Sequence, residues 1–252
     1  MQNNLSTSDN PVFQNAVFQN PMFQNTVFQN TVFQNPNAAR AGGYVLLIAG
    51  LLVAVGLWFH PLPDHGFLER ISTLSSTPWW GVIHVAIAGG FVLCMLGSLL
   101  VLVAGRRDTG WFGMFNWGAI TVGMNFFTGV SLINGYVMHP LTKHLSEPGA
   151  QIVFDAMNNL LVGYGWLGNP LFLLGLTGVT LLEALKPSFG LPRWFTIMGF
   201  IVTLLSWLRG VGSATGLYFL EFFIFANIPA FVWFAVYGAA MARWIQVNQK
   251  LE

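Results

Sequence analysis

Histidines carry the strongest chemical signal in this chain. The sequence His-Pro-Leu-x-x-His occurs twice, and its two copies hold four of the five histidines among 252 residues: His60, His65, His139 and His144. Neutral imidazole is a good ligand for zinc, copper, iron and nickel. Because two turns of this kind could together supply four nitrogen ligands, the motif predicts a transition-metal site.

A structural interpretation competes with the metal site. The residue before proline avoids the α conformation, so we expect the preceding helices to end near His60 and His139. A histidine at a helix C-terminus interacts favourably with the helix dipole, and proline commonly follows helix ends. Each motif could therefore be only a stop signal, since its spacing is less specific for metal than paired Cys-x-x-Cys.

The fifth histidine, His84, lies inside an apolar run. An ionisable residue in a membrane span is costly and usually faces the interior of the helix bundle. His84 is therefore a candidate cofactor-binding residue, as an axial ligand of haem, and a candidate proton relay. A simple hydrogen bond between helices is the structural alternative.

Two acidic residues point to a different function. Asp155 opens the fourth apolar run and Glu221 lies near the start of the sixth. Asparagine precedes a proline break at Asn169-Pro170, and such broken helices can line transport sites. A small transporter or channel with a path past Asp155 and Glu221 is therefore the alternative to the metal or haem protein.

The composition predicts the class of protein that must position these residues. The hydrophobic fraction is 54% and charged residues make up only 8%, against about 25% charged residues in soluble domains. We therefore expect an integral membrane protein in contact with the lipid bilayer. Ten basic residues against nine acidic ones give no support for nucleic-acid binding. Cys94 is the single cysteine, which excludes an intrachain disulfide.

A membrane-spanning helix needs about 20 apolar residues, and the sequence predicts an all-α polytopic bundle of six spans. The predicted spans are residues 42–59, 79–104, 112–138, 157–185, 194–208 and 217–244. With the N-terminus in the cytoplasm, seven basic residues fall on the cytoplasmic side and three on the other. Positive residues favour the cytoplasmic face, so we expect both termini inside and all five histidines at the outer side.

Residues 1–39 form a separate segment ahead of the transmembrane domain of residues 40–252. From residue 12 to residue 35, Val-Phe-Gln-Asn recurs with a period of five, with Met in place of Val in the third unit. Such an Asn/Gln-rich, low-complexity tract is typical of a disordered tail. The alternative is a self-associating segment, because Phe-Gln-Asn ladders suit cross-β stacking.

The transmembrane domain shows one internal repeat and one resemblance. The two histidine motifs are offset by 79 residues (139 − 60), which maps the first predicted hairpin of spans onto the second. Residues 40–104 resemble uncharacterised bacterial multi-span integral membrane proteins. The likeness rests on Phe59-His60-Pro61 at the end of one span and Pro78-Trp79 with His84 at the start of the next. It implies a topology and no chemistry.

The sequence therefore leaves three functions open. The first is a membrane protein that binds a transition metal or haem through the outer histidines, and the second is the transporter or channel. The third is a non-catalytic accessory subunit that packs against a membrane-protein partner or another copy of itself. The motifs identify no particular enzymatic reaction and leave open whether the protein is an enzyme. The expected location is a bacterial plasma (inner) membrane or an internal membrane.

Overall fold

Helices make up every named element of the chain in the computed structural model, which describes residues 32–60, 67–215 and 217–249. In chain order the elements are α3 (Pro36–Trp58), α4 (Phe67–Ser76), α5 (Trp80–Ala104), α6 (Gly110–Leu132), a π-helix (Ile133–Met138), α7 (His139–Leu141), a 3₁₀ turn (Thr142–His144), α8 (Ala150–Leu185), α9 (Arg193–Thr215), a 3₁₀ helix (Tyr218–Ala226) and α10 (Asn227–Gln249). The predicted all-α class is confirmed for this part of the chain.

Five helices in the described ranges are long and apolar enough to cross a membrane: α3, α5, α8, α9 over Arg193–Gly212, and α10. The third predicted span corresponds to α6, which is 23 residues long but is not among the five. Its asparagines and glycines lower its mean hydropathy, although at 1.5 Å per residue it is about 35 Å long.

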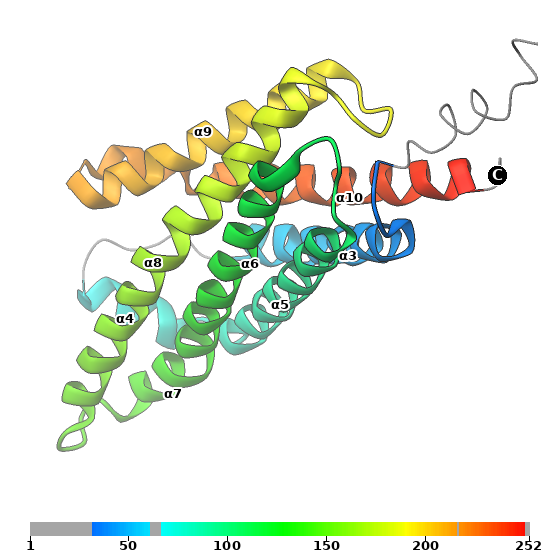
Figure 1. Cartoon of the computed structure of the whole chain (residues 1–252). Coiled ribbons are helices and arrows are strands. Elements are labelled where there is room, and N and C mark those ends of the chain that lie inside the picture. Colours follow the sequence, from blue (N-terminus) through cyan, green and yellow to red (C-terminus); the bar gives the residue numbers. More distant parts are fainter. Residues whose placement is uncertain (1–31, 61–66, 216, 250–252) are drawn as a thin grey trace, which may run out of the picture.

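The six long helices follow one another around a bundle (Figure 1). α3 packs between α10 and α5, α6 packs between α5 and α8, and α9 contacts both α8 and α10. Aromatic rings fill the space between them. Phe172 of α8 stacks on Phe231 of α10 with 5.6 Å between centroids, and Phe127 of α6 lies edge-on to Phe172. These contacts tie α6, α8 and α10 together through the core.

Glycines let the helix backbones of α3 and α10 touch. A methyl group on Gly43 would lie 2.6 Å from the carbonyl oxygen of Gly238, and one on Gly50 would lie 2.5 Å from that of Phe231. Neither position can hold a larger side chain unless the helices separate. In a membrane, where lipid gives no hydrophobic drive to helix pairing, this close backbone contact is what packs the pair.

The prediction for the end of the first helix is confirmed, whereas the prediction for the third is wrong. α3 ends at Trp58, two residues before His60. His139, in contrast, has helical dihedral angles (φ −62°, ψ −49°) and the chain stays helical through His144. The π-helix ahead of it changes the hydrogen-bond register, so Pro140 falls in the first turn of α7, where its missing N–H costs nothing.

Boundaries of α8, α9 and α10 also differ from the predicted spans. α8 begins at Ala150 rather than residue 157, and α9 continues beyond residue 208 to Thr215. α10 begins only at Asn227, because the preceding apolar residues Tyr218–Ala226 form a 3₁₀ helix. Apolar composition alone does not distinguish these two kinds of helix.

The two ends of the bundle differ in character. At one end, Gln249 near the C-terminus accepts from Arg40 and donates to Asn37 at the start of α3. The turns between α5 and α6 and between α8 and α9 lie at this same end, whereas α4 and α7 lie at the other, at the lower left of Figure 1. We call these the terminal end and the histidine end.

α3 begins earlier than the predicted span. Asn35 caps the helix by accepting from the backbone N–H of Ala38 at 3.1 Å, and Pro36 follows at the position where helices tolerate proline best. Residues 32–39 of the predicted tail are therefore part of the folded bundle. The first four repeat units lie outside the described residues.

Candidate functional site

His60 and His84 form a pair at the histidine end. Their Nε2 atoms are 3.2 Å apart, and their rings lie edge to face with 4.9 Å between centroids. His84 is buried at 3% exposure, while His60 is half-buried just beyond the end of α3. Trp80 packs against both imidazoles, and its ring centroid lies 5.1 Å from that of His60 and 4.6 Å from that of His84. The pair joins α3 to α5.

The backbone fixes the tautomer of His84. Its Nδ1 lies 2.9 Å from the carbonyl oxygen of Trp80, one helical turn earlier. A carbonyl can only accept, so Nδ1 carries the proton and, in the neutral ring, the lone pair is on Nε2. Histidines that ligate metals through Nε2 commonly make this same hydrogen bond from Nδ1.

Asn134 completes the site from the π-helix. Its side-chain nitrogen lies 3.0 Å from Nε2 of His84, while its Oδ1 is buried without a partner. The indole N–H of Trp80 donates to the backbone carbonyl of Asn134 at 3.2 Å, which gives this carbonyl of the π-helix a hydrogen-bond partner. Nε2 of His60 and the amide nitrogen of Asn134 thus both approach the single lone pair on Nε2 of His84. Rotating the amide by 180° would place Oδ1 beside the two imidazoles instead.

Two other predicted ligands, His139 and His144, do not join this pair. His139 donates from Nδ1 to the carbonyl of Leu74 at 2.8 Å and so ties α7 to α4, while the exposed His144 pairs with Glu147 at 2.6 Å. Because the second motif is helical, its two histidines are not brought together by a turn. His65 lies outside the described residues. Among the residues described, no three His, Cys, Asp or Glu side chains gather in a metal-binding group.

An apolar cavity of about 410 Å³ lies beside the pair, between α3 and α5. Its walls include Phe59 and Ile83, the chain neighbours of His60 and His84. The remaining lining residues are Leu52, Val55, Gly56, Trp79, Val82 and Ala86. This surface suits an acyl chain of a lipid.

The acidic residues of the transport alternative are not gathered in the described part of the chain. Asp155 is exposed on the first turns of α8. The side chain of Glu221 lies outside the described residues. The transport path therefore stays a prediction.

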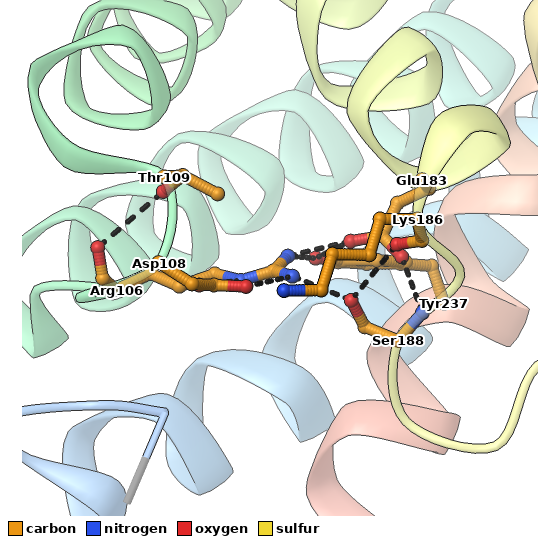
Figure 2. A network of polar contacts seen from close by, with 7 residues as sticks. All are labelled: Arg106, Asp108, Thr109, Glu183, Lys186, Ser188 and Tyr237. Carbon is orange, nitrogen blue, oxygen red and sulfur yellow. Dashed lines mark hydrogen bonds and ion pairs between the residues drawn. The ribbon is translucent and has the colours of Figure 1, made fainter. Parts of the chain in front are cut away.

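A second polar site lies at the terminal end, where Arg106 is surrounded by partners (Figure 2). Its guanidinium donates to the carboxylate of Glu183 at 2.5 Å and to that of Asp108 at 2.7 and 3.0 Å. The hydroxyl of Tyr237 donates to Glu183 at 3.3 Å, and the backbone N–H of Ser188 donates to the same carboxylate at 2.9 Å. The network links the α5–α6 turn, α8, the α8–α9 turn and α10.

Arg106 and Glu183, the central ion pair of this network, are almost fully removed from solvent. The side chain of Glu183 is 0% exposed and that of Arg106 is 7% exposed. Burial opposes the charge of Arg106, but Tyr237, Asp108 and Glu183 outweigh it, and the pKa of Arg106 lies above its ordinary value. The guanidinium thus stays charged throughout the physiological pH range, which makes the network a permanent ionic clamp.

This network was not predicted from the sequence, in which Arg106 contributes only to the excess of basic residues on the expected cytoplasmic side and Glu183 was not singled out. The one available signal was a carboxylate inside the apolar run Leu181-Leu182-Glu183-Ala184-Leu185, because an ionisable residue in a span needs a partner. The distance in sequence between Arg106 and Glu183, 77 residues, hides that partner.

No protein family, curated protein or solved structure matches this chain. The resemblance of residues 40–104 to bacterial multi-span proteins therefore stays a prediction.

Proposed function

We propose that this chain is a six-span membrane protein that binds a divalent transition-metal ion, such as zinc, at its outer end. The ligands are Nε2 of His60, Nε2 of His84 and, after rotation of its amide, Oδ1 of Asn134. The observation that carries the proposal is the 3.2 Å separation of the two imidazole nitrogens, with the tautomer of His84 fixed by Trp80.

The separation suits a tetrahedral metal. Bonds of about 2.0–2.1 Å to a tetrahedral zinc place two ligand nitrogens about 3.3 Å apart. Two histidines in line on either side of a haem iron would need nitrogens about 4 Å apart, with the porphyrin between them. The packing of Trp80 against both imidazoles favours the small ion over haem.

The proposed topology adds α6, third in chain order, to the five other spans and places both termini in the cytoplasm. α6 packs between two helices that are themselves apolar enough to span. Arg106, Lys186 and Arg193 lie in or beside the turns at the terminal end, where the positive-inside rule favours the cytoplasm. The expected location is the plasma membrane of a bacterium.

Metal analysis of protein purified in detergent tests the proposal. We expect wild type to bind about one zinc ion per chain, and the double variant H60A/H84A to bind none while keeping its helix content. The double variant H139A/H144A is the matched control and should bind as wild type does. Absence of metal from wild type, or equal loss in both variants, would overturn the site and leave the transporter and accessory-subunit alternatives.

A further inference from the structure

The last Val-Phe-Gln-Asn unit, residues 32–35, pairs with the backbone of the α5–α6 turn. Gln34 and Asn35 donate their N–H groups to the carbonyls of Gly105 and Ala104, both at 3.0 Å. Arg107 donates back to the carbonyl of Val32 at 2.9 Å, and Phe33 forms an antiparallel bridge with Arg106. We call residues 104–107, together with the ring of Phe189, the docking edge.

Side chains add specificity to this pairing. Phe33 is 1% exposed and stacks on Phe189 at 5.9 Å, with the rings 12° from parallel. Phe189 has a positive φ of 56°, which is strained for a bulky residue, and the Arg106 guanidinium lies 5.2 Å from its ring. Phe33 therefore covers the ring of Phe189, and Phe189 in turn contacts Arg106 of the ionic clamp.

The other three positions of the unit are also used. Val32 packs at the margin of the hydrophobic core, and Asn35 caps α3. Gln34 lies against Gly105, where a Cβ would come within 3.0 Å of the glutamine side chain and where φ is +62°. The docking edge thus pairs with the backbone of Val32, Gln34 and Asn35 and with the ring of Phe33.

The same unit occurs four more times upstream, with its ring at Phe13, Phe18, Phe23 and Phe28. Residues 17–21, Val-Phe-Gln-Asn-Pro, are identical to residues 32–36. One chain carries five units but a single docking edge. More than one unit can be bound at a time only if the additional edges belong to other chains.

We propose that the docking edge is a binding site for Val-Phe-Gln-Asn peptides and that upstream units of one chain occupy the docking edge of a second copy. The exchange conserves the backbone pairing with residues 104–107 and the stacking on Phe189, while the cap of α3 stays with the chain's own Asn35. As in domain swapping, the cost of such an exchange is small. The 17 residues from Asn20 to Pro36 can extend to about 50 Å, whereas a helix is only about 10–12 Å wide. The units therefore reach a neighbouring bundle in the same membrane.

The chain's own unit competes with this exchange. Because residues 32–35 continue directly into α3, their effective concentration at the edge is far higher than that of a unit from another chain. Replacing Phe33 removes that advantage and leaves the upstream units intact. F33A is therefore expected to increase self-association rather than abolish it.

Three proteins test the proposal by light scattering in nanodiscs or detergent: wild type, F33A, and a variant with all five repeat phenylalanines changed to alanine. We expect a several-fold larger dimer fraction for F33A than for wild type. An excess of the peptide Thr-Val-Phe-Gln-Asn-Pro should dissociate the F33A dimer, and Thr-Val-Ala-Gln-Asn-Pro should not. The five-alanine variant should be monomeric and bind one labelled peptide per chain. A monomeric F33A, or a five-alanine variant that does not bind the labelled peptide, would overturn the proposal.

A second measurement keeps Phe33 and so avoids any effect on folding. Two differently tagged wild-type copies are reconstituted at high density in one vesicle population and one tag is captured. We expect co-capture of the second tag, and its loss when only Phe13, Phe18, Phe23 and Phe28 are replaced by alanine. Equal co-capture in both cases would show that the upstream units do not link copies.

Discussion

Glu183 is fully buried and pairs with a guanidinium that is only 7% exposed, so the loss of its carboxylate should be costly. E183A leaves the buried Arg106 with Asp108 as its one remaining carboxylate partner and removes the acceptor for Tyr237. Breaking a buried ion pair costs about 3–5 kcal/mol, so we expect a loss near the lower bound because Asp108 remains. Unfolding of the purified protein in detergent, followed by circular dichroism, measures it.

E147Q is the matched control for that experiment. Glu147 also forms an ion pair, with His144, but its side chain is 64% exposed. Surface pairs of this kind contribute about 0–1 kcal/mol, so E147Q should unfold almost as wild type does. Equal losses for E183A and E147Q would contradict the role of burial in the ionic clamp.

Asn134 gives a second prediction at the residue scale, one that rests on the proposed metal site. N134L removes the amide oxygen while keeping a side chain of similar size beside His84. Removal of a polar group beside a metal site commonly lowers the metal affinity about 10–100-fold. We expect titration with zinc to show a fall in zinc affinity within that range. An unchanged zinc affinity in N134L would mean that the amide takes no part in the site.

Single residues could be predicted from the sequence only where their chemistry is rare in a membrane. His84 was identified because an imidazole inside an apolar run needs a partner, but that partner proved to be His60 and Asn134. The metal cluster of four motif histidines was predicted from a shared local pattern. His60 follows the end of α3, whereas His139 continues a helix, so the shared pattern does not give the two residues the same backbone structure.

At the scale of elements, the α3–α10 contact should depend on the absence of side chains at its glycines. G50A adds a methyl group where the carbonyl of Phe231 would lie 2.5 Å away. Overpacking of this kind costs about 1–3 kcal/mol, and the loss should appear in the unfolding temperature of the purified protein.

G163A serves as the control, because a Cβ at Gly163 meets no atom within 4 Å. Alanine is favoured over glycine inside a helix by about 1 kcal/mol, so G163A should match or exceed wild type in stability. A G50A variant as stable as G163A would contradict close backbone packing of α3 on α10.

The sequence predicted the number and order of the long helices well and their ends less well. Apolar runs of sufficient length identify helices such as α5 directly, since backbone groups in lipid must be paired within a helix. The π-helix at Ile133–Met138 could not be predicted, because it depends on contacts made elsewhere: Trp80 satisfies the carbonyl of Asn134, and Gly135 allows the close approach of His84. The 3₁₀ helix before α10 is a similar case.

For the whole molecule, the proposed topology places the terminal end in the cytoplasm. Native Cys94 is buried, so single cysteines introduced at exposed positions can report the two sides. We expect H144C to react with a membrane-impermeant maleimide on intact cells, and Q34C to react only after permeabilisation. Labelling of Q34C alone on intact cells would reverse the orientation and move the histidine end to the cytoplasm.

The measurement that tests the central claim most directly is X-ray absorption at the zinc edge on purified, zinc-loaded protein. The account predicts two imidazole nitrogens at about 2.0 Å from the zinc, with this signal lost in H60A/H84A and kept in H139A/H144A. A spectrum without imidazole, or one that survives replacement of both His60 and His84, would contradict a metal site built on this pair.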